Sequence, residues 1–149
     1  MKKILFVATG GTIASKKTEN GLTPQITPEE LISYIPEVEK ICEITAVQPF
    51  NLDSSNVVPE NWSMLVKVIR EHYDAFDGFI IAHGTDTMAY TAAALSYMIQ
   101  NSPKPIVITG AQRPINLDIT DAKTNLSDSF YYACDDASRG GTRSCLTER

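Results

Sequence analysis

Short, continuous apolar runs alternate along the chain with longer stretches in which apolar residues recur every three or four positions. The clearest runs are residues 4–8, 78–83 and 105–109, each followed by a polar, glycine-containing turn. Runs of this kind are typical of strands buried on both faces of a parallel sheet. Residues 41–50 predict one more strand, and Pro49 suggests that its end is unpaired, because proline lacks an N–H donor.

The periodic stretches predict helices. Thr27 is expected to cap the first helix, with Pro28 in its first turn and Glu30 completing a capping box. A second helix should span residues 59–76 and turn one apolar face toward the sheet. The residues of that face are Trp62, Leu65, Val66, Ile69, Tyr73 and Phe76.

Two further helices complete the pattern. The third is expected to be capped by Thr85 or Asp86, and the fourth to begin at Thr120 or Asp121 and to continue through Ala133. Strands that alternate with helices in this way predict an α/β fold, with a parallel sheet covered by helices on both faces.

Four polar turns follow strands of the predicted sheet, at Thr12, Ser54, Thr85 and Gln112. Because open α/β folds bind ligands at the carboxyl edge of the sheet, these turns should gather at a site. Residues 15–25 are polar and are expected to form a loop without regular structure, as many lids and binding loops do.

Residues 1–138 should form one domain, and residues 139–149, which have no apolar periodicity, should form an irregular tail. The 149-residue chain carries a net charge of −5 without a basic cluster. This composition argues against nucleic acid or an anionic membrane as a partner, since both require a dense positive patch. The three cysteines, Cys42, Cys134 and Cys145, predict free thiols in a reducing compartment, and so a cytoplasmic protein.

The chain has no motif for a nucleotide or a metal. The segment around Gly10 and Gly11 lacks the glycine spacing of a dinucleotide fingerprint and the Gly-Lys-Ser/Thr of a phosphate loop. Neither a His-Glu-x-x-His nor a Cys-x-x-Cys pattern occurs. We therefore expect no cofactor and no metal, and a small molecule as the substrate.

Two segments carry the most specific signal: ATGGTIAS at residues 8–15 and HGTDTMAYTAAAL at residues 83–95. Taken alone, Thr12 after two glycines could be a helix cap beside a tight turn. Together with NLDSSN at residues 51–56 and ITGAQRP at residues 108–114, the two segments strongly resemble the bacterial L-asparaginase family.

Residues 53–56 and 88–91 are most similar to the cytoplasmic, type I branch of that family. The resemblance covers residues 1–138 and implies the family's N-terminal domain, with a Rossmann- or flavodoxin-like fold. It also implies a homo-oligomer, a dimer or a tetramer, for the full-length protein. Family members carry a second, smaller domain, so the chain is expected to be truncated.

The resemblance implies hydrolysis of L-asparagine to L-aspartate and ammonia through a threonine acyl-enzyme. The nucleophile maps to Thr12, while Thr85 works with Asp86 and a later lysine. The Asp86 carboxylate would also pair with the α-amino group of the substrate. His83 is the nearest free base, but we expect it to face the core and to be structural.

The α-carboxylate of the substrate would be held by Ser54 and its neighbours Asp53 and Ser55, through hydroxyl and backbone donors. Gly84 belongs to the same expected binding set as Thr85 and Asp86. Without the resemblance, residues 51–56 would be interpreted as a surface turn.

Two catalytic helpers of the family are missing from their expected places. The family's flap contributes a tyrosine, but none occurs between Thr12 and Thr27. The family's lysine follows a Gly-Thr-Arg segment that comes after one further strand; here the expected position is Leu146 and the strand is not predicted. Lys123 is expected to be a surface charge.

We therefore expect a poorly active asparaginase; the alternative is a non-catalytic amino-acid-binding or assembly domain. A preference for asparagine or glutamine is left open.

Overall fold

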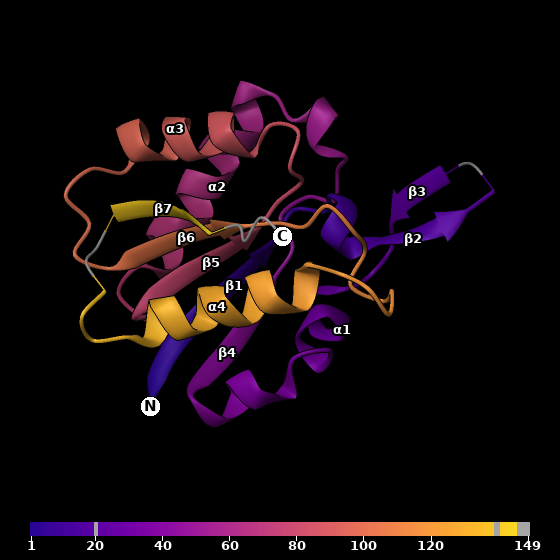
Figure 1. The fold of residues 1–149 in the computed structure, drawn as a ribbon. Helices are drawn as coiled ribbons and strands as arrows, with labels where there is room; N and C mark the ends of the chain where they lie inside the picture. The colour runs from indigo at the N-terminus through magenta and orange to yellow at the C-terminus, as the bar shows by residue number, and fades with distance from the viewer. Residues whose placement is uncertain (20, 139–140, 146–149) are drawn as a thin grey trace.

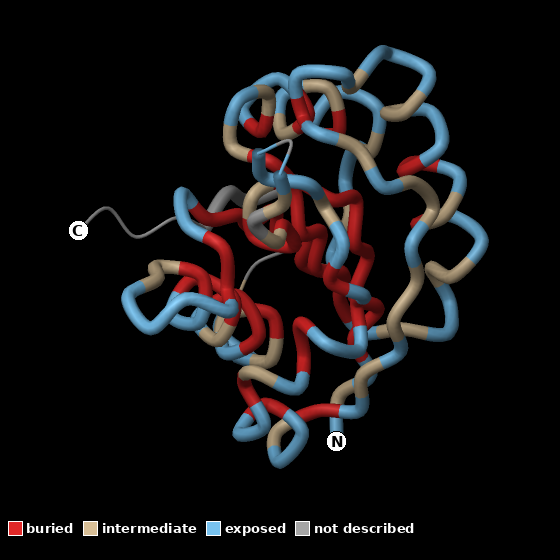
Figure 2. Tube along the Cα trace, turned by 90° about the vertical axis from the view of Figure 1, so that its right-hand side faces the viewer, coloured by how far each residue is buried: buried red, intermediate tan, exposed pale blue. Residues whose placement is uncertain are grey.

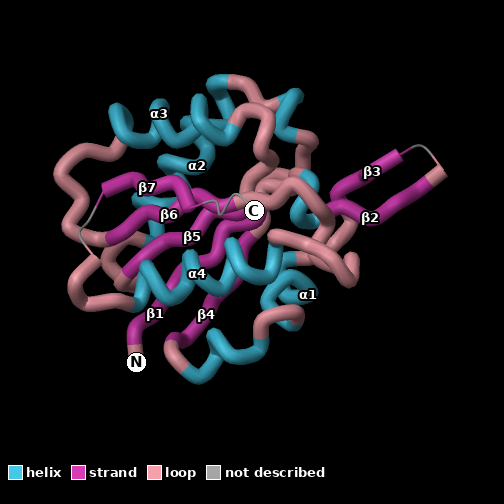
Figure 3. Tube along the Cα trace, viewed as in Figure 1, coloured by secondary structure: helices cyan, strands magenta, loops and turns pink. Residues whose placement is uncertain are grey.

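A parallel five-stranded sheet forms the centre of the protein. The computed structural model describes residues 1–19, 21–138 and 141–145. The strands are β1 (Lys2–Ala8), β4 (Cys42–Val47), β5 (Gly78–Ala82), β6 (Pro105–Thr109) and β7 (Gly141–Cys145). They lie in the order β4-β1-β5-β6-β7 (Figures 1 and 3). Counted among themselves in chain order, the strands have the 2-1-3-4-5 arrangement of flavodoxin-like folds, which confirms the predicted α/β class.

Four α-helices cover the two faces of this sheet (Figure 1). One face is covered by α1 (Pro28–Ser33) and α4 (Ala122–Cys134), the other by α2 (Pro59–His72) and α3 (Met88–Met98). Side chains of β1 alternate between the two cores: Ile4 and Phe6 join the first, Leu5 and Val7 the second. Figure 2 shows the buried residues gathered in the middle of the molecule and the exposed residues along its periphery.

The connection through α4 has the opposite hand to the other three. Helix α1 connects β1 to β4, toward one edge of the sheet. Helices α2 and α3 lead the chain toward the other edge but lie on the opposite face, so all three connections have the same hand. Helix α4 also leads toward that other edge, from β6 to β7, but it lies on the face of α1. Because β-α-β connections are nearly always right-handed, the α4 connection is the left-handed exception.

Strand β7 corrects the expectation of an irregular tail and of a missing strand. Residues Gly141–Cys145 pair in parallel with Pro105–Thr109, so the Gly-Thr-Arg segment lies within a strand. The backbone of β7 pairs within the sheet although its sequence has no apolar run. The hydrophobic pattern therefore did not predict this strand. Residues 139–140 and 146–149 of the expected tail, with Leu146, lie outside the described residues.

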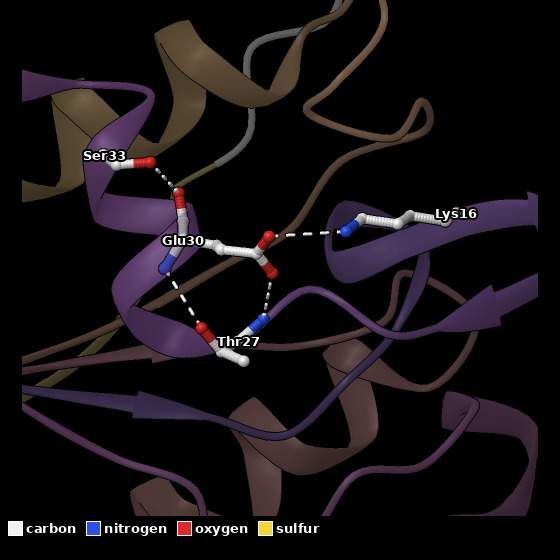
Figure 4. Close-up of polar contacts among 4 residues, drawn as sticks. All are labelled: Lys16, Thr27, Glu30 and Ser33. Carbon is white, nitrogen blue, oxygen red and sulfur yellow. Dashed lines mark hydrogen bonds and ion pairs between the residues drawn. The ribbon is translucent and has the colours of Figure 1, made fainter.

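Residues 15–18 and 21–24 pair with each other, which corrects the expectation of a loop without structure. Strands β2 (Ser15–Thr18) and β3 (Gly21–Pro24) pair antiparallel, and Gly21 has the positive φ of 100° that tight hairpin turns favour. The hairpin extends outward from the sheet (Figure 1). Its Lys16 Nζ lies 3.3 Å from Glu30 Oε1 on α1 (Figure 4).

The first helix begins as the sequence predicts. The Glu30 N–H donates to Thr27 Oγ1 at 3.2 Å, and Glu30 Oε2 accepts from the Thr27 N–H at 3.1 Å (Figure 4). This reciprocal pair is the predicted capping box. Both oxygens of Glu30 are thus engaged, one in the cap and one with the hairpin.

Two other helix predictions need adjustment. Helix α2 ends at His72 instead of residue 76, although Leu65 and Ile69 are buried against the sheet as expected. Helix α3 begins after Thr87, not after Thr85 or Asp86, because Thr87 occupies the N-cap position. None of the described helices is both long and apolar enough to cross a membrane.

Candidate functional site

Close backbone contacts bring three of the predicted turns together at the carboxyl edge of the sheet. Gly84, just after β5, lies between the other two: a methyl group placed on it would come within 2.5 Å of Ser54 Cβ and Oγ and within 3.2 Å of Gly11 Cα. A methyl group on Gly11, whose φ is 79°, would overlap Gly84 in turn. Only glycine fits at these two positions, and its absence of a side chain lets the turns touch.

The fourth turn joins them through Gly110, just after β6. A methyl group on Gly110 would overlap His83 O and come within 3.4 Å of Thr85 Cγ2. All four predicted strand ends therefore meet at one edge. The site lies between the ends of β1 and β5. After β1 the chain continues to β4 on one side, and the later strands lie on the other side, so this position is the topological switch point of the sheet.

Backbone pairing continues past the end of β1 and fixes the segment before Ser54. The Leu52 N–H donates to Thr9 O at 2.9 Å, and the Gly11 N–H donates to Leu52 O at 2.9 Å. Residues 51–56 are therefore tied to the first turn, which a free surface turn would not be.

The predicted reactive side chains differ in exposure. Thr12, at the start of the 3₁₀ turn η1 (Thr12–Ala14), and Thr85 are half-buried, whereas Asp86 is exposed. Within the described residues, no hydrogen bond engages the hydroxyl or the backbone N–H of either threonine. Both groups of each threonine thus lack a protein partner among the described residues.

The turn η3 (Ser54–Asn56) is stabilised by Asp53. Asp53 Oδ1 accepts from the Ser55 N–H at 2.9 Å and from Ser55 Oγ at 2.7 Å. These bonds, the backbone one first, lower the pKa of Asp53 below its usual value. Asp53 and Ser55 thus satisfy each other, and Ser54, which is 3% exposed, is the member that contacts Gly84.

His83 faces the interior, as expected. Its Nδ1 lies 2.7 Å from Gly84 O and its Nε2 lies 2.9 Å from Thr91 Oγ1. Burial lowers the pKa of His83, and the bond to Gly84 opposes that effect only in part. The ring is therefore a neutral, internal group rather than a base open to substrate.

Two residues outside the site predicted from the sequence hold the loop after β6. Asp121, at the N-cap of α4, accepts the N–H groups of Gln112 and Arg113 at 2.9 and 3.1 Å instead of capping its own helix. Buried Asn125 donates to Gly110 O at 2.9 Å. An asparagine at an inward position of the fourth helix, one turn after an aspartate, was the available signal.

The expected proton-transfer lysine is not located. Lys123 is exposed, and its Nζ lies 5.7 Å from the centre of the Tyr34 ring, as suits a surface charge. Leu146 lies outside the described residues. Across the described part of the chain, no three His, Cys, Asp or Glu side chains gather as a metal-ligand set.

Comparison with known proteins gives consistent matches. The L-asparaginase of Thermococcus kodakarensis is 40% identical over 132 residues, which are 88% of this chain and 40% of that protein. A glutamyl-tRNA(Gln) amidotransferase subunit of Archaeoglobus fulgidus is 42% identical over 135 residues, 89% of this chain and 32% of that protein. The crystal structure of a probable cytoplasmic L-asparaginase from Campylobacter jejuni superposes with a TM-score of 0.88 at 30% identity, covering 100% of this chain and 45% of that one.

The chain spans less than half the length of each of these relatives. The family model described as "Asparaginase, N-terminal" matches residues 3–146. Because that match covers almost the whole chain, the protein belongs to the asparaginase family and carries its N-terminal domain.

Proposed function

We propose that the edge formed by Thr12, Ser54, Thr85 and Asp86 binds L-asparagine and hydrolyses its side-chain amide. The observation that carries this proposal is the contact of Gly84 with both Gly11 and Ser54 at the switch point. It puts two glycine–threonine turns beside a buried serine, as a site for a small amino acid requires. Membership of the asparaginase family supports the same reaction.

In the proposed mechanism, the Thr12 hydroxyl oxygen adds to the amide carbon while its proton passes to a base. Backbone N–H groups of Thr12 and Thr85, which are free among the described residues, would stabilise the oxyanion. The carbon–nitrogen bond then breaks, and the nitrogen takes a proton and leaves as ammonia. Water next attacks the ester carbon, which releases aspartate and returns the proton to Thr12.

The remaining groups of the proposed site recognise the two charged ends of the substrate. Asp86 would pair with the α-amino group, and Ser54, supported by the Asp53–Ser55 turn, would donate to the α-carboxylate. Thr85 would pass the proton between Thr12 and its base. Gly84 contributes by its lack of a side chain, since any larger residue would separate the two halves of the site.

A non-catalytic amino-acid-binding or assembly domain is the second candidate. In the part of the chain that the structure describes, no lysine forms an ion pair with Asp86. No tyrosine lies between Thr12 and Thr27. Loss of a positioned proton-transfer group costs about 10²–10⁴ in rate, so binding can persist when turnover is poor.

A coupled ammonia assay tests the proposal. We would compare this chain with a version extended to the length of its relatives, each as wild type, as Thr12→Ala and as Thr124→Ala, an exposed control on α4. We expect the extended wild type and its Thr124→Ala variant to release ammonia, the Thr12→Ala variant to be inactive, and the short chain to be slower by about 10²–10⁴. Retained turnover in Thr12→Ala would remove Thr12 from the nucleophile's role, and equal rates in the two lengths would contradict the argument from the missing base.

To decide between asparagine and glutamine as the substrate, the same ammonia assay is repeated with L-glutamine in place of L-asparagine. A relative named as part of an amidotransferase is as similar as one named as an asparaginase, so assembly with another chain is included in the proposal. The proposal also includes a cytoplasmic location and a homo-oligomer. The Campylobacter jejuni neighbour is titled cytoplasmic, which supports the first of these.

A further inference from the structure

Beneath Thr85, a chain of hydrogen bonds runs from α2 through α3 to the turn after β5. Trp62 Nε1 donates to Thr91 Oγ1 at 3.0 Å, Thr91 Oγ1 lies 2.9 Å from His83 Nε2, and His83 Nδ1 lies 2.7 Å from Gly84 O. His83 and Thr91 are both 0% exposed. Water does not compete at such positions, so each group keeps the partner that the fold gives it.

The chemistry of the partners fixes the direction of every bond. A backbone carbonyl only accepts, so Nδ1 of His83 carries the proton and donates to Gly84 O. In the neutral ring, Nε2 then has a free lone pair and accepts from the Thr91 hydroxyl. The Thr91 oxygen accepts the indole N–H of Trp62. Each of the three bonds thus has one direction, and removing a side chain breaks an identifiable bond.

The chain ends on the peptide bond that joins Gly84 to Thr85. No cis peptide bond occurs among the described residues, and in a trans peptide the C=O and N–H point in opposite directions. Because His83 holds the carbonyl, the Thr85 N–H points away from the imidazole. Gly84 also contacts Ser54 and Gly11. The peptide is therefore held by His83 on its interior side and lies against the turns of the site on its other side.

We propose that Thr91, backed by Trp62, is a positioning residue that acts through His83 to orient the Gly84–Thr85 peptide toward the substrate. That the oriented peptide helps to bind substrate rests on the proposed function, whereas the orientation of the Gly84–Thr85 peptide by His83 does not. Among the described residues, no hydrogen bond joins Trp62 or Thr91 to Thr12, Ser54, Thr85 or Asp86. The sequence pattern placed Trp62 only in an apolar stripe, because the spacing of a helix does not reveal where an indole N–H donates.

The test compares Thr91→Val, which removes the hydroxyl at nearly constant volume, with Thr91→Ser, which keeps it. Leu95→Ala is the control, because it weakens the packing of α3 from a fully buried position without touching the hydrogen bonds. Nitrogen-15 NMR of the ligand-free protein gives the tautomer of His83, and the amide chemical shift of Thr85 reports the orientation of the Gly84–Thr85 peptide. Titration with L-aspartate, the product of the proposed reaction, gives binding.

We expect wild-type His83 to carry its proton on Nδ1. In Thr91→Val, the Thr85 amide resonance should shift because its peptide is no longer held, and aspartate binding should become about tenfold weaker, as for the loss of one buried hydrogen bond. Thr91→Ser should restore both, and Leu95→Ala should change neither to the same extent. The inference is overturned if wild-type His83 carries its proton on Nε2, if Thr91→Val leaves the Thr85 amide unchanged, or if Leu95→Ala changes it equally.

The wild-type tautomer needs no variant, so the inference stays testable if Thr91→Val does not fold. If the wild type binds no aspartate, the proposed function fails for this chain, while the tautomer of His83 and the amide shift of Thr85 still decide whether Thr91 positions the peptide.

Discussion

The contact between Gly84 and Ser54 makes the assembly of the site measurable as stability. In Gly84→Ala, the new methyl carbon would come within 2.5 Å of Ser54 Cβ and Oγ. Ordinary carbon contacts are about 3.5–4.0 Å, so the two turns must separate by about 1 Å. Overpacking of this kind costs about 1–3 kcal/mol. Gly84 has no positive φ, so steric overlap is the only expected cause.

Urea unfolding measures this cost, followed by circular dichroism and by fluorescence of Trp62, the only tryptophan in the chain. With a slope of about 1–3 kcal/mol per molar urea, a loss of about 2 kcal/mol moves the midpoint down by roughly 1 M. This interpretation assumes a single two-state transition, which agreement between the two signals checks.

A double-mutant cycle separates the contact from a general effect. Ser54→Gly removes both atoms that the new methyl meets, so Gly84→Ala combined with Ser54→Gly should be more stable than the two single losses predict, by about 1 kcal/mol or more. Gly21→Ala, at a position with open surroundings, is the control and should not couple to Ser54→Gly. Additive losses, or a Gly84→Ala midpoint equal to wild type, would mean that the two turns do not touch in solution.

Three further outcomes follow from the structure. Ile69→Ala, which empties a position 1% exposed beneath α2, should lower the free energy of unfolding by about 2–5 kcal/mol in urea; a change within error would mean that this face is not packed. Thr27→Ala should cost about 1 kcal/mol, whereas the nearby control Ser33→Ala, outside the capping box, should cost less. Because burial lowers the pKa of His83, stability should be fully present above pH 6.5 and fall as the pH drops below it, where only the unfolded chain gains the proton. His83→Gln should flatten that slope in thermal unfolding between about pH 5 and pH 7, and an unchanged slope would assign it to other groups.

The sequence by itself determined the elements whose signals are local. Continuous apolar runs identified β1, β5 and β6, because strands buried on both faces need no alternation. The capping box at Thr27 was readable, since its two bonds link residues three apart. The two glycine–threonine turns could be placed at strand ends, and thereby at one edge, because all carboxyl ends of a parallel sheet point the same way.

Only the tertiary structure decided what depends on partners distant in sequence. Strand β7 has no apolar run and exists because its backbone pairs with β6. The left-handed connection through α4 follows from which face that helix covers, and its position lets Asp121 and Asn125 hold the loop after β6. Trp62 lies on α2, Thr91 on α3 and His83 just after β5, so no spacing within one helix could predict that they form one chain of hydrogen bonds. Local patterns specify which residues fold together, but the direction of a hydrogen bond and the closeness of two turns are fixed only once the elements have packed.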